Sequence, residues 1–372
     1  MKPKFFLIVF TVLALVVTFG CSPQATPPAY LPPTASRISH TATPNPPETS
    51  TPNPSPTPML NPVAQGYHQM AYDIESDRIV LVAGSDNHCN SPKIATSIFD
   101  LPTKSWELIE TNSSVPKGEG PMAYDAQSDR IIKFVGLRQS CTVFNGLGET
   151  WAYDTNTNTW ENMHPSESPF GLIGARMAYD SESDRMILFG GLDAKSFSAI
   201  PDVWAYDYET NSWKNMHPAG DPPGVDNFFA MSYDVSADRI IAWGCAAGTI
   251  GVYDYNSNTW ESRETETYPS YCDYNAMVYD LGTGLNILFG GTKRSDESPT
   301  NETWGYDYSS NSWKSLSVKN PPSARGWHAM VYDSAAGVMV LFGGGESRDK
   351  FTDEVWVYNP VSGVWSNIVV SP

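Results

Sequence analysis

Short strand-like segments recur along the chain, and each recurrence has the same order of apolar and polar positions. An alternating segment ends in a Tyr-Asp pair, a polar turn and a continuous apolar run follow, and two further short segments close on a tryptophan. Both the Tyr-Asp pairs and the tryptophans recur at steps of 46 to 55 residues. Because alternation with a period of two is typical of β-strands, the pattern predicts an all-β fold built from one repeated unit.

Six copies of the unit align on their Tyr-Asp pairs. The pairs begin at Tyr72, Tyr124, Tyr179, Tyr233, Tyr279 and Tyr332, and the closing tryptophans are Trp106, Trp160, Trp213, Trp260, Trp313 and Trp365. A methionine stands two residues before each of these tyrosines. Residues i and i+2 of a strand share a face, so we expect each methionine to pack beside its tyrosine in the core.

The sixth repeat shows four strands. Residues 328–332 alternate (strand A), residues 338–342 form a continuous apolar run (strand B), residues 355–358 form strand C, and strand D begins at Val364. Repeats of short strands at this spacing are typical of propeller blades. The sequence therefore predicts a six-bladed β-propeller of four-stranded antiparallel blades around a central channel.

Strand B ends in a glycine pair in three repeats, at Gly190, Gly290 and Gly343. A tyrosine follows about fifteen residues later and a tryptophan six or seven residues after that. This arrangement resembles the kelch repeat, whose blades also form the central domain of galactose oxidase. All six repeats run in phase from strand A to strand D. We therefore expect no blade to combine strands from both ends of the chain, unless Val369 and Val370 or the residues before Gly66 supply one.

The first 62 residues do not follow the repeat. Residues 1–20 are predicted to be a signal peptide, because Lys2 and Lys4 precede an apolar run that is short for a membrane-spanning helix. Cys21 directly after Gly20 resembles the modified cysteine of a bacterial lipoprotein. The resemblance implies acylation of Cys21 and an extracytoplasmic, membrane-anchored protein in the cell envelope or at the surface. The alternative is an ordinary cleaved signal followed by a stray cysteine.

The segment after the cysteine is rich in proline and hydroxyl residues. Residues 22–62 contain 13 prolines, 7 threonines and 5 serines. Such a composition favours an extended, disordered stalk. The predicted organisation is a signal peptide (1–20), a lipidated cysteine with its stalk (21–62) and a propeller (63–372).

Charge narrows the range of partners. Without Lys2 and Lys4, 21 basic residues oppose 41 acidic ones, a net charge of −20. A strongly acidic chain does not favour nucleic acid or anionic lipid headgroups. We expect a monomer that contacts the membrane through its anchor alone and binds a protein or glycan that the sequence does not identify.

Neighbouring strands alternate in direction, so the B–C and D–A loops share one face, and the short A–B and C–D turns share the other. Long, variable loops on a rigid frame commonly carry binding sites. Four cysteines fall on the loop face. Because an exported chain favours disulfides, we predict the bonds Cys89–Cys141 and Cys245–Cys272, each between neighbouring blades.

The starts of the A strands should surround the mouth of the channel on the loop face. The residues there are His68, Gln69, Glu119, Arg176, Phe228, Tyr274, Asn275, Trp327 and His328, with Arg325 just before them. The mixture of charges and aromatic rings could bind a sugar, an acid or a peptide. The predicted ligand-binding residues are His68, Glu119, Arg176, Asn275, Arg325, Trp327 and His328. The alternative is that they solvate a water-filled channel.

Catalytic and metal-binding patterns are weak. The acidic A–B turns lack the glycine and late glutamate of a calcium loop, and no Gly-x-Ser-x-Gly motif is present. A copper centre like that of galactose oxidase would need a crosslinked cysteine beside a channel tyrosine, and none is placed there. We expect no cofactor, no metal and no catalytic residue, and interpret the protein as a non-catalytic binding module. The alternative is a sugar-acting enzyme, oxidase-like or resembling exported six-bladed kelch proteins that epimerise sialic acid. Chemistry would then occur at the channel mouth, with Glu119, Arg176 and Arg325 as candidates.

Overall fold

A computed structural model describes residues 62, 66–82, 95–109, 115–138, 148–193, 195–222, 224, 228–244 and 248–371. The signal peptide, Cys21 and nearly all of the stalk lie outside these residues. Within them, the regular elements are β-strands that form six four-stranded antiparallel sheets and three two-stranded ones.

Each four-stranded sheet is one blade. Blade 1 contains β1 (Gln69–Asp73), β2 (Arg78–Val82), β3 (Thr96–Asp100) and β4 (Ser105–Ile109), and blade 2 contains β6 (Met122–Asp125), β7 (Arg130–Val135), β9 (Glu149–Asp154) and β10 (Thr159–Asn162). Blade 3 contains β12 (Arg176–Asp180), β13 (Arg185–Phe189), β15 (Val203–Asp207) and β16 (Ser212–Asn215), and blade 4 contains β17 (Ala230–Asp234), β18 (Arg239–Trp243), β19 (Thr249–Asp254) and β20 (Thr259–Glu264). Blade 5 contains β21 (Ala276–Asp280), β22 (Leu285–Phe289), β23 (Thr303–Asp307) and β24 (Ser312–Ser315), and blade 6 contains β25 (Ala329–Asp333), β26 (Val338–Phe342), β29 (Val355–Asn359) and β30 (Val364–Ile368).

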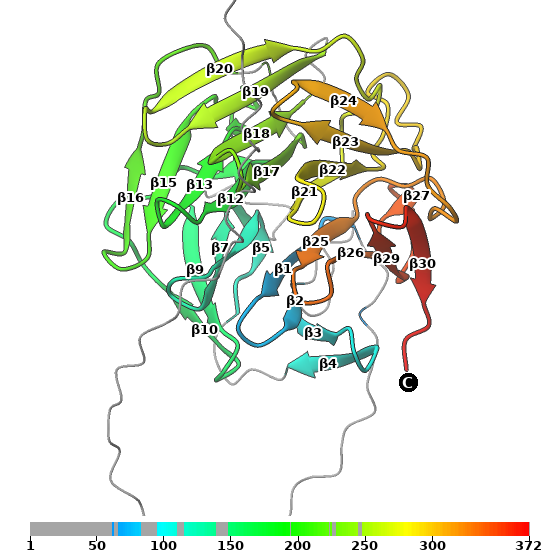
Figure 1. Ribbon diagram of the computed structural model, residues 1–372. Helices are drawn as coiled ribbons and strands as arrows, with labels where there is room; N and C mark the ends of the chain where they lie inside the picture. The colour runs from blue at the N-terminus through cyan, green and yellow to red at the C-terminus, as the bar shows by residue number, and fades with distance from the viewer. Residues whose placement is uncertain are drawn as a thin grey trace, which may run out of the picture. The chain divides into compact units, whose positions relative to one another are not determined.

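The blades form a closed ring, as Figure 1 shows. The innermost strands are β1, β6, β12, β17, β21 and β25, and each lies against the next, with β25 against β1. The predicted six-bladed β-propeller is confirmed, and every described four-stranded sheet is built from the strands A to D of one repeat.

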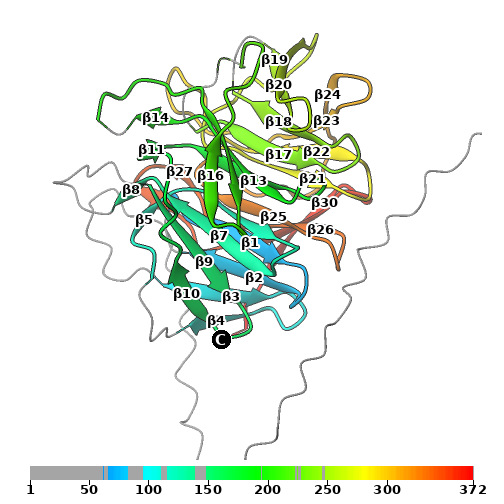
Figure 2. The ribbon, with the colours of Figure 1, turned by 90° about the vertical axis from the view of Figure 1, so that its left-hand side faces the viewer.

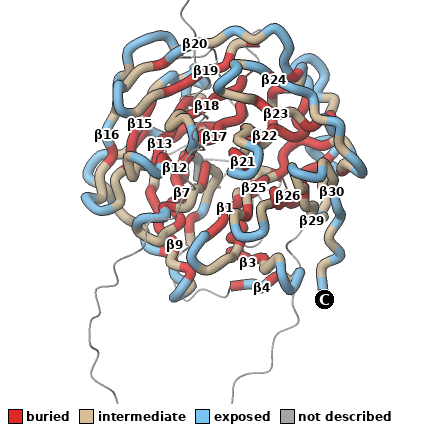
Figure 3. The backbone as a smooth tube through the Cα atoms, in the orientation of Figure 1, coloured by how far each residue is buried: buried red, intermediate tan, exposed pale blue. Residues whose placement is uncertain are grey.

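The hydrophobic core lies between blades. Each of six apolar clusters draws side chains from two neighbouring blades, and the one that joins the ends of the ring packs Met70 and Leu81 of blade 1 against Val340 and Phe342 of blade 6. The strand-A methionines are all buried. Figure 3 shows buried residues concentrated in the inner strands and exposed residues in the turns and outer strands.

The end of the chain adds a backbone contact across the closing interface. Ser371 N donates to Lys104 O over 2.8 Å, at the start of strand D of blade 1. Linkers between earlier blades make the same contact, because Ala219 N donates to Asn258 O and Lys319 N donates to Gly363 O. The tail after β30 thus takes the place of a blade linker at blade 1, and no described residue of the tail forms a further strand.

The glycine pairs mark close approaches to the next blade. Gly290 has φ 61°, and a Cβ added there would lie 2.6 Å from Arg325 O. Both the left-handed backbone and the lack of space require glycine.

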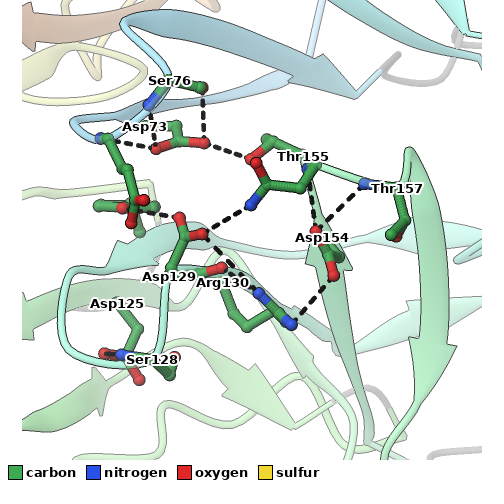
Figure 4. A network of polar contacts seen from close by, with 12 residues as sticks. Asp73, Ser76, Asp125, Ser128, Asp129, Arg130, Asp154, Thr155 and Thr157 are labelled. Atoms are coloured by element: carbon green, nitrogen blue, oxygen red, sulfur yellow. Dashed lines mark hydrogen bonds and ion pairs between the residues drawn. The ribbon is translucent and has the colours of Figure 1, made fainter. Parts of the chain in front are cut away.

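The turn face, made of the A–B and C–D turns, is tied together by aspartates. The carboxylate of Asp73 accepts hydrogen bonds from the backbone of its own turn, at Glu75 and Ser76, and from the hydroxyl of Thr155 in blade 2 (Figure 4). Arg130 pairs with Asp154 over 3.0 Å, which joins the two turns of blade 2. These aspartates therefore act as acceptors for turn backbone and neighbouring side chains.

The loop face, made of the B–C and D–A loops, carries the short sheets. They pair β5 (Gly118–Glu119) with β8 (Leu137–Arg138), β11 (Leu172–Ile173) with β14 (Leu192–Asp193), and β27 (Gly345–Ser347) with β28 (Lys350–Phe351). Figure 2 shows β5, β8, β11, β14 and β27 gathered on one side of the ring.

Candidate functional site

A pocket of about 60 Å³ opens at the channel mouth on the loop face. Six of the seven predicted ligand-binding residues line it: His68, Glu119, Arg176, Asn275, Trp327 and His328. The remaining lining residues are Tyr67, Gln69, Gly120, Pro121, Gly174, Ala175, Phe228 and Tyr274. Residues from every blade therefore meet at one site.

Four aromatic residues just before strand A have left-handed backbone. Their φ angles are 61° at Tyr67, 59° at Phe228, 58° at Tyr274 and 61° at Trp327. Bulky side chains rarely adopt this conformation, which costs of order 1–3 kcal/mol per residue. Its recurrence in four blades shows that the surrounding structure imposes it.

Backbone hydrogen bonds between blades account for this conformation. Trp327 N donates to Tyr274 O over 3.0 Å, and Tyr274 N donates to Phe228 O over 3.1 Å. Phe228 N in turn points to Gly174 O at 3.4 Å. A chain of peptide groups thus runs around the mouth from blade 3 to blade 6.

The aromatic rings form one cluster over blades 4, 5, 6 and 1. The centroid distances are 4.4 Å from Phe228 to Tyr274 and 4.7 Å from Tyr274 to Trp327, and Tyr67 contacts Phe228 and Tyr274 edge-on at 6.2 and 6.1 Å. Burial is the main cause that raises the pKa of the Tyr67 phenol. The cluster gives this side of the mouth a rigid apolar surface.

Blade 3 carries Gly174 where blades 1, 4, 5 and 6 carry a ring, and blade 2 carries Glu119 at that place. Gly174 has φ 72°, in the same left-handed region as the rings. The mouth is therefore asymmetric, with rings over four blades and none over blades 2 and 3. We call the side of the mouth at Gly174 the glycine gap.

Arg176 lies at the edge of the glycine gap. Its Nε donates to Phe229 O of blade 4 over 2.7 Å, and Nη1 is 3.4 Å from Ala175 O. Burial lowers the pKa of the guanidinium to about 10, and the Tyr274 phenol is the group that opposes this shift. Arg176 is thus a cation in a desolvated site with carbonyl partners.

A second cation lies behind the wall of the pocket. Lys133 on β7 is buried, and its Nζ donates to Gly120 O over 3.0 Å. Burial lowers the pKa of Lys133 to about 8, although the charge of Glu119 opposes the shift. Equivalent positions in the other blades are Leu81, Leu188, Ala242, Leu288 and Leu341. Lys133 is therefore a charged exception at an apolar position.

Two histidines occupy matching places in blades 1 and 6. His68 Nε2 lies 2.9 Å from Phe342 O, the end of strand B in the preceding blade. Burial, together with the charges of Arg325 and His68, lowers the pKa of His328 to about 3. His328 is therefore neutral, and its ring packs against Phe289 of blade 5 with a centroid distance of 5.4 Å.

The two other predicted residues differ in position. Asn275 lines the pocket, and its buried Oδ1 makes no hydrogen bond to any described residue. Arg325 does not line the pocket: it is 1% exposed and pairs with Glu354 over 2.6 Å. Its Nη1 also donates to Gly343 O over 3.0 Å. The structure therefore places Arg325 in the packing between loops of blades 5 and 6.

The described residues contain no group of three or more His, Cys, Asp or Glu side chains suited to a metal ion. They also contain no helix long and apolar enough to cross a bilayer. Cys272 is buried and disulfide-bonded. Cys89, Cys141 and Cys245 lie outside the described residues, so both predicted pairings stay predictions.

The repeats match the model of a known protein family. Residues 44–244 and 181–372 match the KLHDC2/KLHL20/DRC7 Kelch-repeats domain. The chain belongs to the kelch-repeat family.

Relatives of the kelch chain share parts of it at low identity. It is 23% identical over 147 residues to acyl-CoA-binding domain-containing protein 5 of Arabidopsis thaliana, which covers 40% of this chain and 22% of that protein. It is 31% identical over 93 residues to multiple epidermal growth factor-like domains protein 8 of Mus musculus, 24% of this chain and 3% of that protein. It is 20% identical over 240 residues to a putative F-box/kelch-repeat protein of Arabidopsis thaliana, 60% of this chain and 62% of that protein. The chain thus spans less than two thirds of each relative.

A solved structure shares the fold of the kelch propeller. The structure titled "Structure of YjhT" superposes with a TM-score of 0.62 at 13% identity, over 84% of this chain and 99% of that one. At this identity the likeness concerns the arrangement of the blades.

Two pocket features of the kelch propeller escaped the sequence analysis. Tyr67 precedes Met70 by three residues, as Trp327 precedes Met330, so alignment of the repeats could have found it. Lys133 interrupts an apolar strand B, which is the signal that could have singled it out.

Proposed function

We propose that the protein is a non-catalytic binding module that recognises a protein or a glycan through its loop face. The observation that carries the proposal is the channel-mouth pocket, where a rigid aromatic cluster faces the glycine gap and Arg176. Concave sites with aromatic walls and few polar groups suit small ligands or the projecting end of a larger one. The kelch propeller fold is compatible with such a role.

The proposal includes an extracytoplasmic protein tethered to a membrane in the cell envelope or at the surface. Its support is the predicted signal peptide, Cys21 and the proline-rich segment that follows. Acylation of one cysteine would hold the propeller at the membrane while the stalk extends it outward. Expression of Cys21→Ser tests this, because the variant should lose its acyl label and leave the membrane fraction.

A binding panel tests the recognition. The full chain, purified in detergent, is titrated against immobilised glycans and peptides. Phe228→Gly is the informative variant, because Gly174 holds the same place in blade 3 with the same backbone. We expect Phe228→Gly to weaken binding about tenfold or more, as loss of an aromatic anchor does. Leu281→Ala, at a position 45% exposed on the turn face, serves as the control. Equal binding by wild type and Phe228→Gly would exclude the mouth as the site.

One observation keeps the sugar-acting enzyme as a second candidate. Glu119 and Arg176 line the same pocket, and an acid near a cation could act on a bound sugar. The ligands found in the panel are therefore incubated with the protein and analysed for conversion. Turnover that is lost in Glu119→Gln would favour the enzyme, whereas tight binding without conversion favours the binding module.

A further inference from the structure

The B–C loop of blade 6 contains a small hairpin beside the aromatic cluster. Its strands are β27 and β28, and its base is fixed where Gly345 and Gly326 exchange two backbone hydrogen bonds of 3.0 Å. Beyond Gly345, every residue up to Lys350 is exposed. The tip therefore projects from the frame, and two of its side chains, Arg348 and Phe351, contact the aromatic cluster.

Arg348 and Phe351 lie against two rings of the cluster. The centre of the Arg348 guanidinium is 5.7 Å above the centroid of the Tyr274 ring, and Nη2 donates to the Tyr274 hydroxyl over 3.1 Å. Phe351 contacts Trp327 edge-on, with a centroid distance of 6.3 Å. The hairpin is thus part of the cover over Tyr274 and Trp327, which are 9% and 4% exposed.

An ion pair joins the hairpin to the B–C loop of blade 5. Arg348 contacts Glu297 at two points, with Nη2 2.6 Å from Oε1 and Nε 3.1 Å from Oε2. The two side chains are 45% and 48% exposed, so water and salt weaken their attraction. An exposed pair of this kind changes an equilibrium by about fivefold or less.

The loop that carries Glu297 does not require a carboxylate for its shape. In blade 3, Phe197 N donates to Asp193 O over 2.8 Å, and in blade 5 Glu297 N donates to Lys293 O over the same distance. Phe197 and Glu297 also share a left-handed backbone, with φ angles of 56° and 55°. The carboxylate is therefore an addition to a shared loop conformation, placed where it meets Arg348.

We propose that the hairpin, residues 345–351, is a lid over the aromatic cluster, and that Arg348 and Glu297 form the latch that holds it closed. The inference rests on the function proposed above, because the lid controls access to the rings assigned there to the ligand. Opening exposes Tyr274 and Trp327 and so enlarges the apolar surface of the mouth.

The lid can open while the frame of blade 6 stays intact. Gly345 remains bonded at the base, and below it β26 and β29 pair through Phe342 and Val355. Among residues 346–351, Phe351 is the one apolar side chain. Segments with few buried apolar contacts open locally at low cost. The cost of opening therefore lies mainly in Phe351 and in the latch.

Hydroxyl-radical footprinting of the full chain tests the lid without any ligand. The oxidation rates of the Tyr274 and Trp327 side chains are measured by mass spectrometry. Glu297→Gln breaks the ion pair and keeps the size of the side chain, and we expect both rates to rise about two- to fivefold. Tyr306, which is fully buried elsewhere in blade 5, is the internal reference.

Glu346→Gln is the matched control. Glu346 pairs with Lys350 inside the same hairpin, so this variant also loses one acidic charge but keeps the contact with Glu297. Its ring oxidation should equal that of the wild type. Raising the salt concentration from about 0.1 M to about 1 M should increase ring oxidation in the wild type, because salt screens an exposed pair. The increase should be smaller in Glu297→Gln.

The outcomes separate the lid from the wider function. Equal ring oxidation in wild type and Glu297→Gln overturns the lid, and so does an equal rise in Glu297→Gln and Glu346→Gln. A closed lid lowers the fraction of competent protein, so Glu297→Gln should bind a panel ligand up to about fivefold more tightly. If the footprint changes as expected but no panel ligand binds, the proposed function fails and the lid stands. If a ligand binds while the footprint is unchanged, the proposed function stands and the lid fails.

Discussion

The indole Nε1 of Trp213 in blade 3 donates a hydrogen bond of 2.7 Å to the hydroxyl of Thr150 in blade 2. The same bond joins Trp160 to Thr96 at 2.8 Å and Trp365 to Thr303 at 3.2 Å. Strand D of one blade is thereby fixed to strand C of the preceding blade.

Three interfaces lack this bond, because Val203, Ile250 and Val355 stand where the other blades have threonine. At two of these interfaces the buried indole N–H groups of Trp260 and Trp313 have no partner among the described residues. We expect Val203→Thr to supply an acceptor for Trp260 and to raise the free energy of unfolding by about 1 kcal/mol. Urea unfolding measures the change.

The converse substitution is the control. Thr150→Val leaves the Trp213 indole without its acceptor, and we expect it to lower the free energy of unfolding by about 1–3 kcal/mol. If Val203→Thr destabilises the protein and Thr150→Val does not, the hydroxyl does not act as an acceptor for the indole.

Lys133 should destabilise the folded protein at neutral pH. Burial lowers its pKa from 10.5 to about 8, so the unfolded chain binds more protons between these two pH values. Stability therefore rises with pH through this window, and below it the buried charge has its full cost. We expect Lys133→Leu to raise the free energy of unfolding by about 2 kcal/mol at pH 7. This gain should become smaller as the pH approaches 10.5. Urea unfolding at pH 7 and pH 10 gives both values, and a gain that is constant with pH would contradict the assignment.

His328 should contribute to acid denaturation. Burial lowers its pKa from 6.5 to about 3, so between these pH values the unfolded chain binds a proton that the folded chain does not. The contribution of neutral His328 to stability is complete above pH 6.5 and decreases as the pH falls toward 3. His328→Asn copies Asn275, the residue at this place in blade 5. Between pH 7 and pH 4 the wild type should lose about 3 kcal/mol more unfolding free energy than the variant. Parallel pH profiles for the two proteins would refute a buried, neutral His328.

The backbone contact at the end of the chain can be tested by removing one N–H group. Ser371→Pro eliminates the donor to Lys104 O, whereas Ser371→Ala retains it. We expect Ser371→Pro to lower the free energy of unfolding by about 1 kcal/mol and to speed amide exchange in β4. Similar exchange in the two variants would show that the contact does not hold blade 1.

Much of the frame follows from periodic features of the sequence. The Tyr-Asp pairs, the strand-A methionines and the closing tryptophans recur because each blade buries them in the same way, so six repeats predict six sheets. Glu119, Arg176 and His328 could be placed at the mouth for the same reason. Arg325 differs, because it lies before the repeated segment and its partner, Glu354, comes from a loop with no repeating pattern.

Other features depend on contacts between blades that a periodic pattern does not reveal. The left-handed backbone of Phe228 and Tyr274 arises from peptide groups of neighbouring blades, and neither residue type favours it alone. The burial of Lys133 likewise depends on Gly120, which the loop before strand A brings over it.

The chain of peptide hydrogen bonds around the mouth bears on how a ligand would enter. Because main-chain groups hold the rings of Phe228, Tyr274 and Trp327 in position, little ordering entropy remains to be lost on association. The side chain at each of these positions can also change while the supporting frame is kept, as Gly174 already illustrates. Specificity in such a scaffold can therefore diverge one blade at a time.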